Sequence, residues 1–279
     1  MRYMAFNFRA IYLPAGKRRK YCRTGVYVVL FLYIFMTACL FFQESIAGDP
    51  NRERADTILQ KIDDLWRSSS SKARLKMVVK TNNYTRTMIM DNWTKGKDKS
   101  LVMIMLPLKE KGMISLKNGN TMYTYLPKTD RVIRLTSGMM MGSWMGSHFT
   151  NDDLVKESRL SEDYNPLITF EGLRDGQQII EFDLIPKPDA PVVWGKIVIA
   201  VLLDDYLPIV SRYYDEDLVL ARTLEFHQIE EMGGRRIPAV MHMVPADKPG
   251  EFTELIYGEI NFDIALQDSM FSLMQLRRM

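Results

Sequence analysis

The three histidines, His148, His227 and His242, are the side chains of this sequence best suited to acid–base or metal chemistry. His227 and His242 fall on two successive strand-like segments, so they are expected to be neighbours in a sheet. No His-Glu-x-x-His motif is present, and a zinc site needs three or four ligands. No glycine-rich loop has the sequence context of a phosphate site. We therefore predict no metal and no cofactor.

The other stretch with catalytic potential is Gly142–Gly146 (Gly-Ser-Trp-Met-Gly), and directly after it Ser147 and His148 lie near Asp152, as in a possible triad. In a Gly-x-Ser-x-Gly nucleophile elbow the serine stands third, whereas here it stands second. Proximity in sequence is also not the geometry of a catalytic triad. Thr150 and Asp153 instead have the spacing of a helix capping box, with Asp in place of Glu. We predict that the protein is not an enzyme and has no catalytic residues, and a hydrolase remains the weakest alternative.

The same stretch is rich in apolar side chains and in glycine. Three glycines between Gly138 and Ser147 give the backbone freedom, yet so much apolar surface must cover something or be covered. Methionine suits an adaptable lining for acyl chains, although it also fills gaps in ordinary cores. We predict a hydrophobic lid or cavity lining that binds a ligand through Met139, Met140, Met141, Trp144, Met145 and Phe149.

A small basic cluster precedes this loop and consists of Lys128, Arg131 and Arg134. Such a cluster is usually a solvated strand face. The second interpretation is contact with a lipid headgroup or a partner.

The distribution of charge separates the first 47 residues from the rest. The chain has 279 residues, 47% of them hydrophobic, and a net charge of +3. Seven of the 37 basic residues and one of the 34 acidic residues precede Gly48, which leaves a net charge of −3 beyond it. Residues 48–279, which we call the body, are therefore mildly acidic, and this argues against a nucleic-acid-binding protein.

Residues 1–47 have the pattern of an export signal or membrane anchor. A basic segment is followed by the uncharged apolar run Gly25–Phe42 and by small residues at Ser45–Ala47, the order found in secretory signals. Three interpretations stay open: cleavage before Gly48, retention of Gly25–Phe42 as an inner-membrane anchor, and lipidation at Cys39. Each places the body in the periplasm. Both cysteines lie in this segment, so the body contains no disulfide and no thiolate metal site.

The body opens with an amphipathic helix, expected over Asn51–Arg67, and continues as strands. The Asn118-Gly119 dipeptide predicts a tight hairpin turn before the strands Thr121–Leu126 and Arg131–Leu135. Turn residues separate eleven further strand-like segments. These are Lys76–Thr81, Thr85–Trp93, Ser100–Leu106, Gly112–Lys117, Leu167–Leu173, Gln177–Ile185, Val193–Leu203, Leu207–Asp215, Ala221–Ile229, Arg236–Val244 and Phe252–Phe262.

Alternation of apolar and polar residues in these segments predicts an antiparallel sheet with one covered face. So many strands do not form a flat open sheet, which would curl or close. Three segments are available to fill the concave side: Asn51–Arg67, a turn after Thr150, and Leu266–Phe271. No repeat and no long linker is visible, so residues 48–279 are expected to form a single domain.

Several blocks of the chain together resemble the outer membrane lipoprotein-sorting protein family, which is related to the LolA/LolB carriers. The most specific is a methionine- and glycine-containing loop that leads into Phe-Thr-Asn-Asp-Asp-Leu. The resemblance covers about residues 50–279. The blocks that carry it are Ala55–Trp66, Met122–Pro127, Arg131–Arg134, Gly142–Leu154, Arg222–Phe226 and Gly233–Pro238.

This resemblance implies a mainly β (α+β) fold, namely an unclosed antiparallel β-barrel wrapped around a few helices. It also implies a periplasmic, non-catalytic carrier or chaperone that acts in outer-membrane lipoprotein sorting. Its partners would be lipoprotein acyl chains or a free lipid, held in an apolar cavity. The alternative is an accessory or docking subunit of an inner-membrane export pump, with the transporter as partner and no cargo of its own.

Overall fold

The computed structural model describes residues 50–156 and 159–279. The expected signal or anchor, including Gly25–Phe42 and Cys39, lies outside these residues. Within the described ranges no helix has the length and apolar character needed to cross a membrane. Asp49–Met279 form one compact unit, which is the part of the chain considered below.

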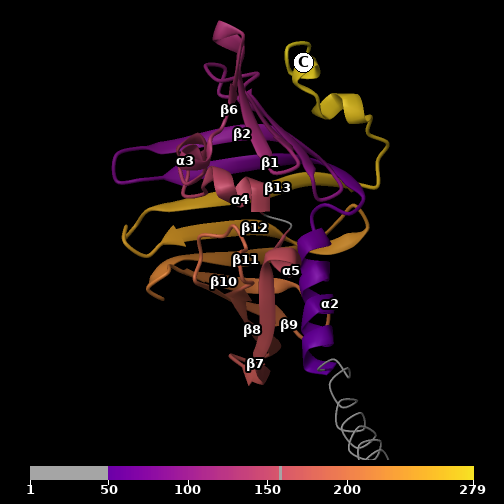
Figure 1. Ribbon diagram of the computed structural model, residues 1–279, viewed down its shortest axis with the longest axis vertical. Coiled ribbons are helices and arrows are strands. Elements are labelled where there is room, and N and C mark those ends of the chain that lie inside the picture. The colour runs from indigo at the N-terminus through magenta and orange to yellow at the C-terminus, as the bar shows by residue number, and fades with distance from the viewer. Residues whose placement is uncertain (1–49, 157–158) are drawn as a thin grey trace, which may run out of the picture. The chain divides into compact units, whose positions relative to one another are not determined.

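The described residues build one antiparallel sheet of thirteen strands, in the order β6-β5-β4-β3-β2-β1-β13-β12-β11-β10-β9-β8-β7 (Figure 1). Strands β6 and β7 are unpaired edges, so the sheet is open, and the predicted fold class is confirmed. The first and last strands pair at the centre. The strands are β1 (Ser70–Lys80), β2 (Thr85–Lys95), β3 (Lys99–Leu106), β4 (Ile114–Asn118), β5 (Thr121–Leu126), β6 (Arg131–Arg134), β7 (Tyr164–Arg174), β8 (Gln177–Pro186), β9 (Lys196–Leu202), β10 (Pro208–Tyr214), β11 (Leu220–Met232), β12 (Arg235–Pro245) and β13 (Phe252–Phe262).

Local sequence accounts for the way these strands form and turn. In β1 the apolar residues Leu75, Met77 and Val79 alternate with lysines and other exposed or half-buried residues, and all three are buried. The predicted hairpin between β4 and β5 is present, and Gly119 has a φ of +59°. A glycine is suited to that left-handed conformation because it has no Cβ.

Helix α2 (Pro50–Asp64) packs on one half of the sheet (Figure 1). Its apolar face, which includes Ile58 and Leu59, shares a core cluster with Phe182 of β8 and Ile199 of β9. The helix predicted at the start of the body is therefore confirmed. Burial of this face stabilises the helix, since helical propensity alone is weak for fifteen residues in water.

One connection joins the two edges of the sheet, from the end of β6 to the start of β7. We call residues 135–156 and 159–163 the crossover segment. It contains α3 (Ser137–Met140), the 3₁₀ turn η2 (Trp144–Gly146), α4 (Asn151–Lys156) and α5 (Leu160–Asp163). Its side chains pack with residues of β1–β3 and β11–β13, so it lies across the inner face of the sheet (Figure 1).

The C-terminal residues form η3 (Asp268–Phe271) and α6 (Leu273–Leu276), and they lie on the opposite, outer face. Phe271 packs with Leu101 and Leu116. The neighbours of these residues in sequence, Val102 and Ser115, instead contact the inner cluster or the crossover segment. The prediction that Leu266–Phe271 fills the concave side is wrong, because β3 and β4 are apolar on both faces and the outer face also needs a cover.

Candidate binding cavity

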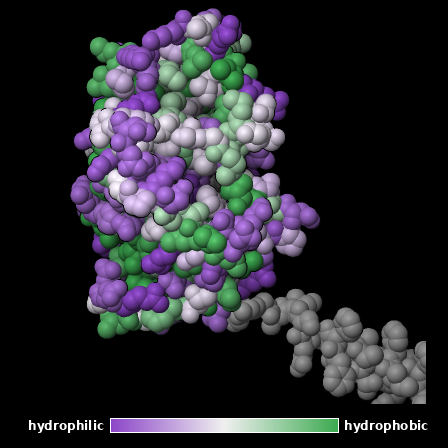
Figure 2. Space-filling model, turned by 90° about the vertical axis from the view of Figure 1, so that its left-hand side faces the viewer, coloured by the Kyte–Doolittle hydropathy of each residue, from purple (hydrophilic) through white to green (hydrophobic). Residues whose placement is uncertain are grey.

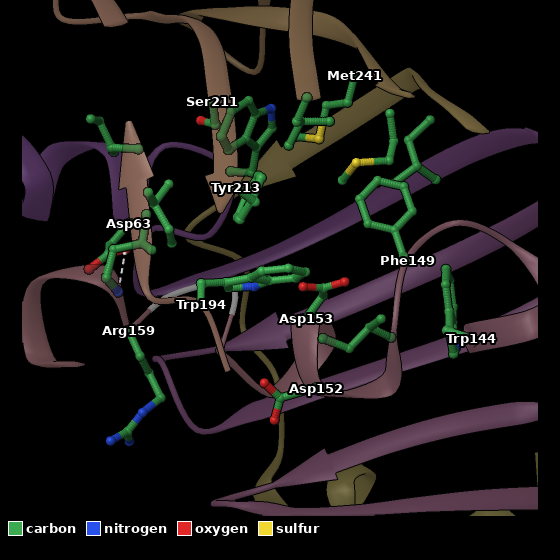
Figure 3. Close-up of a pocket in the computed structure, with 18 of the residues that line it drawn as sticks. Asp63, Trp144, Phe149, Asp152, Asp153, Arg159, Trp194, Ser211, Tyr213 and Met241 are labelled. Carbon is green, nitrogen blue, oxygen red and sulfur yellow. Dashed lines mark hydrogen bonds between the residues drawn. The ribbon is translucent and has the colours of Figure 1, made fainter. Parts of the chain in front are cut away.

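A cavity of about 190 Å³ lies between the inner face of the sheet and the helices that cross it (Figure 3). Its lining comes from α2 and the turn after it, β1–β3, the crossover segment, the start of β7, the β8–β9 connection and β9–β13. Much of the lining is apolar and aromatic. These residues include Trp66, Leu75, Val102, Leu224, Phe226, Met241, Met243, Leu255 and Tyr257.

The structure brings only two of the six predicted lid residues to this cavity. Trp144 and Phe149 line it and are 5% and 9% exposed. The indole Nε1 of Trp144 donates a hydrogen bond to Ser115 Oγ on β4 at 3.0 Å. Phe149 precedes Thr150, the capping residue of α4. Both side chains therefore form part of the packed wall of the cavity.

The four methionines lie outside the lining. Met140 and Met145 are half-buried and pack against the inner core cluster. Met139 and Met141 point into solvent, with exposed fractions of 45% and 49%. Their contact with a ligand stays a prediction.

Two glycines of the crossover segment, Gly142 and Gly146, allow other atoms to approach the backbone closely. A Cβ on Gly142 would lie 3.1 Å from the carbonyl oxygen of Met139. Gly146 has a φ of +72°, and a Cβ there would lie 3.2 Å from Tyr84 Oη. Tyr84 Oη donates a hydrogen bond to Gly146 O at 2.9 Å, and Arg86 Nη1 donates to Met145 O at 3.0 Å. Strand β2 and the preceding turn thus hold the crossover segment in place.

The predicted capping box at the start of α4 is confirmed. The backbone N–H of Thr150 donates to Asp153 Oδ2 at 2.7 Å, and the N–H of Asp153 donates to Thr150 Oγ1 at 3.2 Å. Asp153 also accepts hydrogen bonds from Arg222 Nη1 at 2.7 Å and Nη2 at 2.5 Å. One carboxylate therefore orders the helix and joins it to β11.

Arg222 is the most important residue of the cavity that the sequence did not single out for a role. Its guanidinium carbon Cζ lies over the rings of Trp194 and Tyr213, at 4.4 Å and 4.5 Å from their centroids. Burial works against the charge of this group, but the Asp153 carboxylate, with smaller contributions from Tyr213 and Asp152, offsets burial, so the pKa of Arg222 is raised. Figure 3 shows Asp153, Trp194 and Tyr213 around the same space. Burial also raises the pKa of Tyr213 to about 12, so its hydroxyl stays protonated at neutral pH.

A polar rim lies at the α2–α5 end of the cavity. Asp63 of α2 accepts hydrogen bonds from the backbone N–H groups of Leu160 and Ser161 and from Ser161 Oγ. Burial raises the pKa of Asp63, although the bonds from Ser161 offset part of this effect. Arg159 is paired with Asp163 at 3.2 Å. The bonds of Asp63 therefore connect α2 to α5 at this end of the cavity.

A protein-family model described only as an uncharacterized protein matches residues 96–278, well over half of the chain. The chain belongs to this family. No curated protein matches the sequence.

Three solved structures resemble the chain over nearly their whole length. A DUF1329 family protein from Desulfovibrio piger is 22% identical, with a TM-score of 0.73, covering 82% of this chain and 100% of its own. An outer membrane lipoprotein-sorting protein domain from Vibrio parahaemolyticus is 24% identical, with a TM-score of 0.71 and the same coverage. A LolA superfamily protein from Nitrosomonas europaea is 21% identical, with a TM-score of 0.67, covering 78% and 97%. The expected resemblance is confirmed, and the fold is LolA-like.

In this LolA-like fold the ring of His148 contacts Thr253 and Glu251, and not the Ser147 and Asp152 side chains of the triad considered from the sequence. Its Nδ1 lies 2.9 Å from Thr253 Oγ1, and its Nε2 lies 3.0 Å from Glu251 Oε2. Thr253 is fully buried, and none of the three residues lines the cavity. A hydroxyl without access to a substrate does not act as a nucleophile, so we interpret the cluster as a structural link between the crossover segment and β13.

His227 and His242 are neighbours on β11 and β12, as expected, with ring centroids 6.4 Å apart. Each contacts a carboxylate at 3.2 Å, Glu225 and Glu254 respectively. Across the described residues, no cluster of three or more His, Cys, Asp or Glu side chains has a geometry suited to a metal ion.

The basic cluster Lys128, Arg131 and Arg134 is exposed on η1 (Pro127–Thr129) and the edge strand β6. None of the three lines the cavity. Their contact with a headgroup or a partner stays a prediction.

Proposed function

We propose that this protein is a non-catalytic carrier that holds acyl chains of a lipoprotein or a lipid in the cavity of its LolA-like fold. The observation that supports this most directly is the apolar cavity between the open sheet and the crossover segment. Transfer of an acyl chain from water into such a site is favourable by roughly 0.8 kcal/mol per CH₂. In this proposal the protein acts in the periplasm, in outer-membrane lipoprotein sorting.

The size of the cavity indicates that loading involves movement. Its volume of about 190 Å³ is below the range of about 300–1,000 Å³ that is usual for ligand pockets. An open sheet with a single crossing connection can widen when that connection moves. The proposed carrier therefore opens by displacement of the crossover segment.

The polar groups of the cavity support binding over catalysis. Asp153 is paired with Arg222, Asp163 is paired with Arg159, and Asp63 accepts hydrogen bonds from α5. An acid–base catalyst needs titratable side chains that converge on a substrate. Asp153 and Asp63 instead join elements of the fold to one another, and the Asp163 pair lies within α5 and its N-cap.

The direct test is native mass spectrometry of the full-length protein purified from a bacterial envelope, followed by solvent extraction and identification of the extracted molecules. The proposal expects an acylated molecule at near-stoichiometric occupancy. A protein that stays free of ligand after incubation with envelope lipids would overturn it.

A docking subunit of an inner-membrane export pump is the second candidate. Large apolar side chains are exposed near the β7 edge and at the β10–β11 turn: Leu167 (59%), Leu173 (65%), Leu218 (59%) and Val219 (61%). Figure 2 shows that hydrophobic residues reach the surface in several places on one side of the molecule. A protein free of ligand that co-purifies with a transporter would favour this function.

A further inference from the structure

We infer that Arg222 is a recognition site for the carbonyl oxygen of an acyl ester or acyl amide inside the cavity. This inference rests on the proposed carrier function and specifies the polar part of the cargo. Arg222 lines the cavity and is 5% exposed. Its Nε is buried, and no residue in ranges 50–156 and 159–279 accepts a hydrogen bond from it.

The other nitrogens of the guanidinium already have partners. Nη1 and Nη2 donate to the two carboxylate oxygens of Asp153, and Nη1 also lies 3.5 Å from the carbonyl oxygen of His148. Nε is the one nitrogen of the group without an acceptor among the described residues, so its N–H is open to a ligand. A buried donor without an acceptor is unfavourable, so an acceptor atom of the cargo at this position stabilises the loaded protein.

The guanidinium is held in one orientation before a ligand arrives. Its Cζ lies over the rings of both Trp194 and Tyr213, which are themselves packed edge-on with centroids 5.4 Å apart. The two bonds to Asp153 fix rotation in the plane of the group. A donor with a fixed direction gives specificity at little entropic cost.

The charge balance favours a neutral acceptor over an anion. Asp153 neutralises Arg222, and Asp63, Asp152 and Asp163 also line the cavity. The other two cations of the lining are engaged: Arg159 pairs with Asp163, and Arg67 donates to backbone carbonyls. A carboxylate or phosphate would meet uncompensated negative charge here, whereas an ester or amide carbonyl needs only the one donor.

The position of Arg222 on its strand fits the shape of such a ligand. Arg222, Leu224 and Phe226 are alternate residues of β11, and all three line the cavity. Alternate side chains of a strand point to the same face, roughly 6–7 Å apart. A carbonyl at Arg222 therefore places the attached hydrocarbon along Leu224 and Phe226.

The test measures displacement of the neutral probe N-phenyl-1-naphthylamine from the full-length protein by methyl palmitate, palmitate and hexadecane. We expect methyl palmitate to bind about three- to tenfold more tightly than hexadecane. Arg222→Lys keeps a cation for Asp153 but loses the planar group that fixes the direction of the Nε–H, so the preference for the ester over hexadecane should fall towards one. The matched control Leu224→Ala should weaken the ester and the alkane together.

Infrared spectroscopy of carbonyl-labelled methyl palmitate gives a second readout that needs no variant. A hydrogen bond from Nε lowers the stretching frequency of the bound carbonyl relative to that of the ester in hexadecane. An unshifted band, or equal affinity for ester and alkane, would overturn the inference while the carrier proposal stands. Tighter binding of palmitate would replace the neutral acceptor by an anion. Failure of all three ligands to displace the probe would overturn the carrier proposal itself.

Discussion

At the scale of single residues, the crossover segment contains two kinds of apolar side chain. Trp144 is buried against the cavity and bonded to Ser115, whereas Met141 is half-exposed. Both were predicted from composition to serve the same role. Their environments separate them, because a buried aromatic ring contributes packing that an exposed methionine does not.

Substitution by alanine should show this difference. Trp144→Ala is expected to lower the free energy of unfolding by about 3–5 kcal/mol, because it removes a packed ring and leaves Ser115 without its donor. Met141→Ala should change it by less than about 0.5 kcal/mol, because half of the side chain is already in water. Urea unfolding followed by circular dichroism measures both. Equal losses would contradict the assignment of Trp144 to the wall.

The link between the crossover segment and β13 predicts a dependence on pH. The backbone N–H of Asn82 and the side chain of His148 hold the pKa of Glu251 below its ordinary value of 4.5. A carboxyl whose pKa is lower in the folded state stabilises the protein above pH 4.5. That contribution is lost as the pH falls through the lowered folded-state pKa.

Glu251→Gln should therefore lower the melting temperature at neutral pH, and the difference from the parent protein should narrow towards about pH 3. Glu231→Gln serves as the control, because Glu231 is exposed at the end of β11. Thermal unfolding across this pH range measures both variants. Parallel curves for the parent and Glu251→Gln would show that the contact with His148 and Asn82 does not stabilise the ionised form of Glu251.

At the scale of secondary-structure elements, sequence patterns predicted the strands well. Thr121–Leu126 and Phe252–Phe262 have the expected bounds, and other strands differ by a few residues at their ends. Alternation and turn residues carry this information locally. β1 starts earlier than expected, at Ser70, because Ser71 donates to Trp66 O and bonds Thr94 on the neighbouring strand.

The cavity was less predictable because its key contacts are long-range. The pairing of Arg222 with Asp153 joins residues 69 positions apart, and the sequence offers no local sign of it. The glycines of the crossover segment indicated freedom, but Gly142 and Gly146 instead permit close backbone approach. The C-terminal segment covers the outer face of β3 and β4. Both strands are apolar on both faces, so the periodicity of their sequence does not show which residues face outward.

The contacts of the crossover segment with β2 and the preceding turn should set the rate of loading. Tyr84→Phe removes the hydrogen bond to Gly146 O and leaves the ring in place. We expect ligand uptake and release to become faster by up to about tenfold, with global stability changed by about 1 kcal/mol or less. Tyr123→Phe is the matched control, because Tyr123 packs with the outer cluster. Stopped-flow fluorescence of the neutral probe measures the rates, and unchanged rates for Tyr84→Phe would exclude this contact as the barrier to loading.

At the scale of the whole described unit, the order of the strands explains why one connection governs the cavity. The first and last strands, β1 and β13, pair at the centre of the sheet, and β6 and β7 form its two edges. The crossover segment begins after β6 and ends before β7, so it runs from one edge of the sheet to the other. The sheet is therefore held by backbone hydrogen bonds throughout, while the cover of its inner face depends on side-chain contacts. Segments held mainly by side-chain contacts open at lower free energy than central strands.

Hydrogen–deuterium exchange should report this difference on loading. In the ligand-free protein, peptides of the crossover segment should exchange faster than those of β1 and β13. Binding of an acyl ester should slow exchange in the crossover segment, because the ligand packs against Trp144 and Phe149 on the wall of the cavity. The C-terminal segment on the outer face is the internal control and should be unchanged, since its cluster of Leu101, Leu116 and Phe271 lies on the other side of the sheet. Protection of the outer segment alone would place the ligand outside the cavity and contradict the carrier proposal.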